Sequence, residues 1–230
     1  MHSRSQTDRR RLLVAGAGAL VGLPTLAVAA EKPGIDPEEG VTAPEDLMKE
    51  HGVLNRCLLL YEEGMRRLRA GEDAPPEVFQ HVGMLVRQFV EQYHEKNEEN
   101  FIFPVFKRAG RLTGLVETLL TQHKAGRRLT ARILRLSQGD AYGDPQNRKR
   151  LVANCAAFIR MYRPHEARED TVLFPALRTI LPAAQVLELG ERMEEFEQKA
   201  LGHEGFERSV AQVEALEKQL GIHDLKQFTP

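Results

Sequence analysis

The chain of 230 residues has no tryptophan, only two cysteines and few aromatic residues, which make up 6% of it. Two cysteines exclude a disulfide-rich scaffold. A hydrophobic content of 42% excludes a disordered chain. The formal net charge of -1 leaves no basic excess, so the composition does not favour nucleic-acid binding. Beyond an N-terminal segment, about 200 residues remain, which is enough for one domain with a full core.

Residues 1–30 have the pattern of an export signal. Arg9, Arg10 and Arg11 precede two leucines and an apolar run over 14–30, which is short for a membrane span. Paired arginines before leucines resemble a twin-arginine signal, which implies a periplasmic or other extracytoplasmic location. An ordinary secretory signal and an uncleaved anchor are the alternatives. Residues 31–41 read as a linker, and no stable membrane span is expected after cleavage.

The rest of the chain has helical periodicity and no convincing alternation of the kind that predicts strands. Thr42 and Glu45 form a capping-box pattern at the start of the first helix. Glycines and prolines then separate the predicted helices, which run from 42 to 70, from 75 to about 109, from 115 to 136, from 146 to 177, and onward from 182. The sequence therefore predicts an all-α fold. We expect an antiparallel up-down four-helix bundle over 42–180 and a C-terminal helical extension over 181–230.

An internal repeat carries the chemistry. Residues 94–104 align with residues 165–175 in the pattern His-Glu-x-x-Glu-acid-x-x-aliphatic-Phe-Pro. Each stretch follows another histidine at nearly the same distance, since His51 precedes the first by 43 residues and His123 precedes the second by 42. Histidine and glutamate four residues apart share one face of a helix. The chain therefore reads as two helical hairpins, each with one histidine and one His-x-x-x-Glu.

In the first hairpin, His51 lies 20 residues before Gly71 and His94 lies 19 residues after Pro75, so antiparallel helices place the two histidines at one level. In the second hairpin His123 and His165 lie at a similar level if the loop after Ser137 absorbs a few residues. Four imidazoles and two carboxylates at one level of a bundle predict a metal site, for which iron, manganese and zinc are suitable. Without cations, the burial of six such groups would be very costly. Because metal binding requires neutral imidazoles, it should weaken at low pH. The predicted ligands are His51, His94, Glu98, His123, His165 and Glu169.

Six positions in this order resemble the hemerythrin-like (HHE cation-binding) family, over roughly 45–177. The resemblance implies two non-haem irons, with manganese or zinc as alternatives. It also implies that the four histidines are terminal ligands and that Glu98 and Glu169 bridge the metals, together with an oxo or hydroxo group. Oxygen-carrying hemerythrins have an extra histidine near the third ligand, whereas here Arg127 stands four residues after His123.

The ligand count bears on function. Four histidines, two bridging carboxylates and a bridging oxygen leave two positions open on a pair of octahedral ions. Open positions admit exogenous ligands. The sequence therefore favours a protein that binds or turns over oxygen, peroxide or a related small oxidant, and an oxidoreductase that consumes them is the enzymatic form of this hypothesis. Two alternatives are reversible binding of oxygen or nitric oxide, as carrier or sensor, and iron storage or delivery in the periplasm.

Several acidic residues beside the predicted ligands leave alternatives open. Asp170 competes with Glu169 as the bridge, but the repeat favours Glu169 because it matches Glu98. Glu95 and Glu166 each follow a predicted ligand and lie about 100° around the helix from it, so we expect them at the surface, with a role as ligand or as hydrogen-bond support for a ligand as the alternative.

Other candidate residues have a simpler interpretation. Tyr162 shares the face of His165 and is expected in the core, where a hydrogen bond near the metals is the alternative, whereas Tyr93 is expected to be peripheral. His203 lies in a Gly-His-Glu-Gly stretch, which favours a turn rather than a metal ligand. The two cysteines, Cys57 and Cys155, are expected to be buried thiols rather than a disulfide.

Overall fold

The computed structural model describes residues 42–230, and the predicted signal and linker lie outside the described residues. Helix α1 (Ala43–Ala70) begins as the capping box predicts, because the backbone N–H of Thr42 donates to Glu45 at 2.9 Å. It ends at Gly71, whose left-handed backbone lets its N–H bond to the carbonyl of Arg67. The first predicted helix is therefore confirmed at both ends.

The second rod is continuous but not uniformly α-helical. It consists of α2 (Pro76–Leu85), the π-helix η1 (Val86–His94), α3 (Glu95–Asn97), the π-helix η2 (Glu98–Ile102) and α4 (Phe103–Ala109). In η2 the N–H of Phe103 bonds to the carbonyl of Glu98, five residues back. The next residue is Pro104, which in an α-helix would press its ring against the carbonyl four residues earlier. A wider π-turn at this point relieves that clash.

The second half of the repeat has the same geometry. Helix α5 (Thr113–Leu136) and the short α6 (Gly139–Gly143) lead into α7 (Pro145–Arg168), the π-helix η3 (Glu169–Leu173) and α8 (Phe174–Leu177). The N–H of Phe174 bonds to the carbonyl of Glu169, again five residues back and just before a proline. Both predicted bridging glutamates therefore begin a π-turn.

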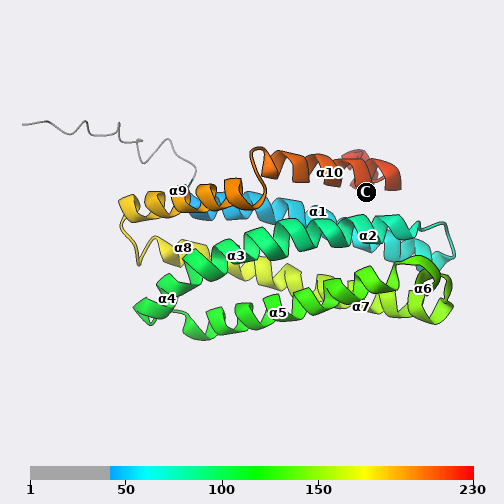
Figure 1. Cartoon of the computed structure of the whole chain (residues 1–230), viewed down its shortest axis with the longest axis horizontal. Coiled ribbons are helices and arrows are strands. Elements are labelled where there is room, and N and C mark those ends of the chain that lie inside the picture. The colour runs from blue at the N-terminus through cyan, green and yellow to red at the C-terminus, as the bar shows by residue number, and fades with distance from the viewer. Residues whose placement is uncertain (1–41) are drawn as a thin grey trace, which may run out of the picture. The chain divides into compact units, whose positions relative to one another are not determined.

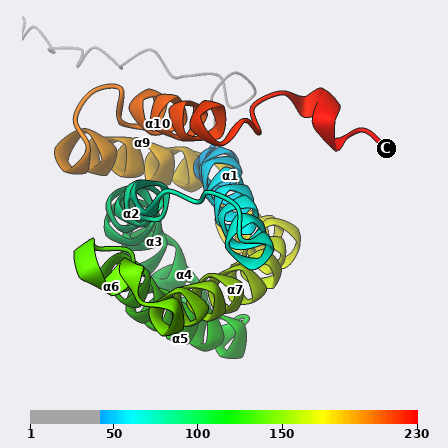
Figure 2. The ribbon, with the colours of Figure 1, turned by 90° about the vertical axis from the view of Figure 1, so that its right-hand side faces the viewer.

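Four helical rods lie side by side in alternating directions: α1, α2–α4, α5 and α7–α8 (Figure 1). Contacts join α1 to α2, α2 to α5, α5 to α7 and α7 to α1, so the four surround a common interior (Figure 2). The described residues are all-helical and contain no strand, as predicted. None of the described helices has the length and apolar character needed to span a bilayer.

The C-terminal segment forms two helices, α9 (Ala183–Ala200) and α10 (Gly205–Leu220), and a final 3-10 turn, Leu225–Phe228. Both helices pack on α1 and the second rod (Figure 2). The guanidinium of Arg56 donates two hydrogen bonds to Glu217, at 2.8 and 2.6 Å, and so joins α10 to α1. The predicted extension is thus helical, and it covers one side of the rods.

The apolar interior is divided into two clusters. One is built around Tyr61, Phe79 and Phe158, and the other around Phe106 and Leu177. On every rod a stretch of buried polar residues separates the positions that belong to the two clusters. The fold therefore brings one polar layer from each of four rods to the middle of the core.

Close packing next to this layer gives a first prediction. A Cβ on Gly126 of α5 would lie 2.1 Å from the hydroxyl oxygen of Tyr162, whereas a Cβ on Gly114 of the same helix would meet nothing within 4 Å. We expect Gly126→Ala to lower the free energy of unfolding by about 1–3 kcal/mol, because buried atoms must move apart. Gly114→Ala should cost nothing, since alanine favours helix. Urea denaturation of both variants measures the difference. Equal stability of the two variants would contradict the packing described.

Candidate metal centre

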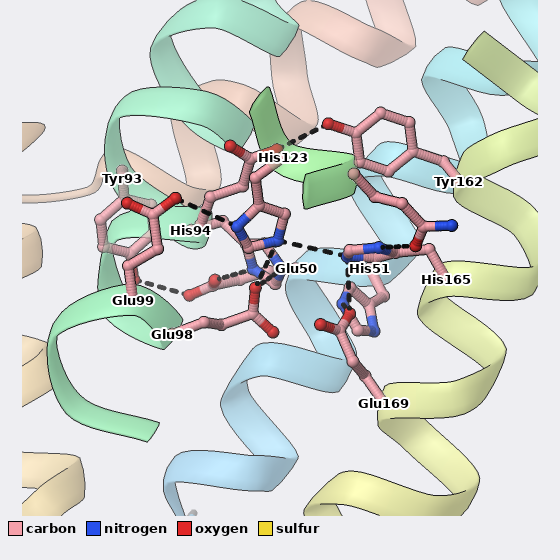
Figure 3. Close-up of polar contacts among 12 residues, drawn as sticks. Glu50, His51, Tyr93, His94, Glu98, Glu99, His123, Tyr162, His165 and Glu169 are labelled. Carbon is pink, nitrogen blue, oxygen red and sulfur yellow. Dashed lines mark hydrogen bonds and ion pairs between the residues drawn. The ribbon is translucent and has the colours of Figure 1, made fainter. Parts of the chain in front are cut away.

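The six residues predicted as ligands come together in the polar layer (Figure 3). The histidines come from α1, η1, α5 and α7, and the glutamates are the first residues of η2 and η3. All six are buried, with exposed fractions of 0–4%. They are His51, His94, Glu98, His123, His165 and Glu169.

The Nε2 atoms of all four histidines face the two carboxylates. A carboxylate oxygen of Glu98 lies 3.4 Å from Nε2 of His123 and 3.8 Å from Nε2 of His94. A carboxylate oxygen of Glu169 lies 3.2 Å from Nε2 of His165 and 3.4 Å from Nε2 of His51. Within the second hairpin, the Nε2 atoms of His123 and His165 are 3.3 Å apart. Each carboxylate therefore receives one histidine from each hairpin.

The carboxylates have no adequate partner within the protein. Both oxygens of Glu98 and both oxygens of Glu169 are buried without a hydrogen bond, and so is Nε2 of His51. Unsatisfied buried polar atoms cost about 1–3 kcal/mol each, and charged ones cost more. The potential ligand atoms of the six residues fall into two groups, and within each group all atoms lie within 4.8 Å of one another. One group comes from Glu98, His123, His165 and Glu169, and the other from His51, His94 and Glu98. This donor set fits metal cations, which would satisfy the unpaired atoms together.

Electrostatics in the metal-free protein reflect the crowding. Burial, with the nearby Glu169 charge, raises the pKa of Glu98 to about 8. Burial would also raise the pKa of Glu169, but the adjacent His165 and His51 hold it well below its usual value. For His123, burial favours the neutral ring, yet the adjacent carboxylates of Glu98 and Glu99 raise its pKa to about 10. At neutral pH these pKa values leave protons on His123 and Glu98, where a bound cation would take their place.

The outer nitrogen of each histidine has an acceptor. In the first hairpin, Nδ1–H of His51 donates to Asp170 (2.8 Å) and that of His94 to Glu50 (2.6 Å). In the second, Nδ1–H of His123 donates to Glu99 (3.1 Å) and that of His165 to Gln122 (2.9 Å). An acceptor at Nδ1 fixes the proton there and leaves the lone pair on Nε2, which faces the centre. Once deprotonated, the four rings therefore direct Nε2 lone pairs at the centre, which is the tautomer and orientation that metal ligation requires.

Sequence reasoning placed Asp170 as a rival bridge, and the structure separates the two roles. Glu169 lies at the centre, whereas Asp170 lies at the outer side of His51, with 36% of its side chain exposed. The equivalent residue of the first repeat, Glu99, likewise lies at the outer side of His123.

The prediction that Glu95 and Glu166 lie at the surface is wrong. Both are buried, with exposed fractions of 1% and 3%. Glu95 accepts a hydrogen bond from Tyr162 at 2.6 Å and pairs with Arg127 at 2.6 Å. Glu166 accepts a hydrogen bond from Asn55. Burial raises the pKa of Glu95 to about 7 and that of Glu166 to about 8. Side chains from neighbouring rods cover these acids, which the periodicity of their own helices cannot show.

Tyr93 was also misplaced as peripheral. It is buried, and its hydroxyl donates to Glu50 at 2.6 Å. The sequence analysis does not identify Glu50 as part of the site, although its position in the repeat indicates this role. It directly precedes His51, as Gln122 directly precedes His123, and both accept from the second histidine of their own hairpin. Tyr162 lies in the core as predicted, with its hydrogen bond to Glu95.

Aromatic rings close the site along the rods. The ring of Phe174 stacks on His51 at 5.8 Å between centroids, and that of Phe103 stacks on His123 at 5.5 Å. These two phenylalanines occupy equivalent positions in the repeat, directly before the prolines. Each therefore covers the first histidine of the other hairpin and limits the access of water to it.

The remaining candidates lie away from the polar layer. His203 is exposed in the turn between α9 and α10, as its glycine-rich neighbourhood predicts. Cys57 and Cys155 are buried free thiols, and burial raises the pKa of Cys57 to about 12.

Comparison with known proteins places this arrangement in a family. The model of the hemerythrin HHE cation binding domain matches residues 42–177 and, in a second match, 115–226. Three mycobacterial proteins, two from strains of Mycobacterium tuberculosis and one from Mycobacterium bovis, are 44% identical to the chain over 231 residues. The matches cover 96% of this chain and 91% of each relative, and all three relatives are described as uncharacterized. No solved structure matches the chain significantly.

The matched residues include the whole polar layer, with its buried histidines and glutamates able to hold a metal. The chain therefore belongs to the hemerythrin HHE cation-binding family.

Proposed function

We propose that this protein is an exported hemerythrin-like oxidoreductase that holds two non-haem irons and consumes oxygen, peroxide or a related small oxidant. The observation that carries the proposal is the set of four Nε2 atoms directed at two buried carboxylates whose oxygens have no other partner. The four antiparallel rods are, on this proposal, the up-down four-helix bundle of the family. Export rests on the twin-arginine pattern of residues 9–13, outside the described residues.

His51, His94, His123 and His165 would be the terminal ligands, and Glu98 and Glu169 the bridges. Each glutamate already lies between one histidine of each hairpin, which is the position that a bridging ligand requires. When bound, the irons would supply redox chemistry and open coordination positions for a small ligand. The outer acceptors hold the imidazoles in place, and Phe103 and Phe174 exclude water.

Two other functions use the same site. Reversible binding of oxygen or nitric oxide, as a carrier or sensor, needs the metals and an open position but no turnover. Iron storage or delivery needs metals that leave readily. The burial of all six ligands favours retained metal over delivery, because an exchangeable ion needs an exposed path. Release of iron to a chelator within minutes would favour delivery instead.

Removing a bridge tests the ligand assignment. We expect the wild-type protein to bind two irons per chain, and Glu98→Gln or Glu169→Gln to lose most of that iron, because an amide is a poor bridging ligand. Without metal, Glu98→Gln should be no less stable than the wild type, since burial already disfavours the charge on that carboxyl, whereas Glu169→Gln should be less stable, since His165 and His51 stabilise the charge of Glu169. Iron analysis and denaturant unfolding measure the two effects. Glu117→Gln, on the exposed part of α5, is the control. Wild-type iron content in both variants would refute the assignment.

Iron binding should release protons. In the metal-free protein the raised pKa values of His123, about 10, and Glu98, about 8, keep protons at the centre at pH 7. A cation must displace both protons, so affinity should rise with pH up to about 10, and more steeply below pH 8, where Glu98 also holds a proton. Below pH 8 it should fall by about tenfold per pH unit for each proton displaced. Anaerobic titration calorimetry with Fe²⁺, in buffers of different ionisation enthalpy, counts the released protons. Affinity independent of pH between 6 and 8 would contradict this electrostatic picture.

Peroxide separates turnover from simple binding. The iron-loaded protein should consume many equivalents of hydrogen peroxide per site, while iron-depleted Glu169→Gln should consume none. A peroxide electrode and an oxygen electrode follow the reaction. If the loaded protein instead forms an oxygen adduct that is stable for hours and releases oxygen unchanged, the carrier function is the correct one.

A further inference from the structure

The internal repeat allows the two halves of the metal centre to be compared position by position. The centre divides into two half-sites, each with the two histidines of one hairpin: half-site A holds His51 and His94, and half-site B holds His123 and His165. Ring centroids are 4.8 Å apart within A and 5.0 Å apart within B. Each central glutamate faces one histidine of each half-site, so we compare the half-sites at their outer Nδ1 atoms.

In half-site A both outer acceptors are carboxylates. Asp170 accepts from His51, and Glu50 accepts from His94. The two oxygens of Glu50 each receive a donor at 2.6 Å, one from the hydroxyl of Tyr93 and one from His94. Burial raises the pKa of Glu50 well above its usual value, but the donor at each oxygen, and a cation on His94 when metal is bound, favour the ionised form. No Lys or Arg pairs with Glu50 or Asp170 among the described residues.

In half-site B the negative charge is absent or compensated. Gln122, which replaces Glu50 in the repeat, is neutral and accepts from His165 at 2.9 Å. Glu99, the acceptor for His123, also pairs with Arg127 at 2.7 Å and with Lys96. Arg127 occupies the position of Asn55 in the first hairpin. Both breaks in the repeat therefore act in the same direction, toward less negative charge around half-site B.

A carboxylate on the outer N–H of a ligand histidine makes the imidazole a stronger donor to its metal. A charge this close, in a buried site, also acts through a low effective dielectric. Two uncompensated carboxylates therefore stabilise a more highly charged ion, whereas a neutral amide and a compensated glutamate stabilise it less.

We propose that the two half-sites are electrostatically inequivalent, so that half-site A holds the ion of higher charge. With two irons bound, the first electron removed leaves Fe³⁺ beside His51 and His94 and Fe²⁺ beside His123 and His165. Glu50 and Gln122 are then positioning residues that act through the histidines and set the order of oxidation. This inference rests on the proposed function, since it requires two irons.

The test uses a matched pair of substitutions in the full chain loaded with two irons. Glu50→Gln removes a charge at A and keeps a hydrogen-bond acceptor, and Gln122→Glu adds a charge at B. Redox titration with ferricyanide and dithionite, followed by electron paramagnetic resonance of the half-oxidised state, gives both one-electron potentials. Glu50→Gln should raise the first potential, and Gln122→Glu should lower the second. Each should reduce the stability of the half-oxidised state toward disproportionation by about tenfold.

The opposite signs distinguish charge from damage. If the substitutions only disturbed the packing of the site, both variants would lose iron, or both would shift their potentials in the same direction. The double variant Glu50→Gln/Gln122→Glu conserves net charge, so it should keep the mean potential while the two potentials approach each other. If Glu50→Gln fails to hold iron, Asp170→Asn tests half-site A at a partly exposed position.

Two irons bound with potentials that Gln122→Glu leaves unchanged, or moves apart, would overturn this inference and leave the proposed function intact. Failure of the wild type to bind two irons would instead reject the proposed function.

Discussion

The structure depends on one constraint, the burial of two carboxylates and four imidazoles in the middle of a helical core. No Lys or Arg among the described residues pairs with Glu98 or Glu169, and their oxygens have no hydrogen-bond donor. Each such atom opposes folding unless something positively charged satisfies it. The arrangement is favourable as the interior of a metalloprotein and unfavourable as an ordinary core. The membership of the chain in a cation-binding family agrees with this energetic argument.

Around this centre the protein is built to fix the direction of the nitrogen atoms. Every histidine has an acceptor on its outer nitrogen, and two of those acceptors are held by further groups, Glu50 by Tyr93 and Glu99 by Arg127. Two apolar clusters close the polar layer from either end. The C-terminal helices α9 and α10 pack against α1, which carries His51 and Glu50. A buried site with rigid walls of this kind is suited to small ligands rather than to large substrates.

The fold class and the six central residues could be predicted because their signals are local and repeated. Periodicity identifies the helices, and the interval between the two histidines of each hairpin brings them to one level. The repeat also favours Glu169 over Asp170, and the structure places Glu169 at the centre and Asp170 at the outer side of His51.

What could not be predicted depends on contacts between rods. Glu95 is buried because Tyr162 and Arg127 cover it from other helices. The hydrophobic periodicity of its own helix does not indicate either contact. The π-turns at Glu98 and Glu169 arise where a proline follows six residues later, a signal that helical periodicity alone does not detect. Glu50 could have been found by asking which acceptor each outer nitrogen requires.

The most direct test of the central claim is anomalous diffraction at the iron edge from crystals of the iron-loaded protein. The account predicts two peaks in the polar layer, one beside Nε2 of His51 and His94 and one beside Nε2 of His123 and His165, with Glu98 and Glu169 touching both. A layer without a peak, or a metal held elsewhere while these imidazoles point to solvent, would contradict it.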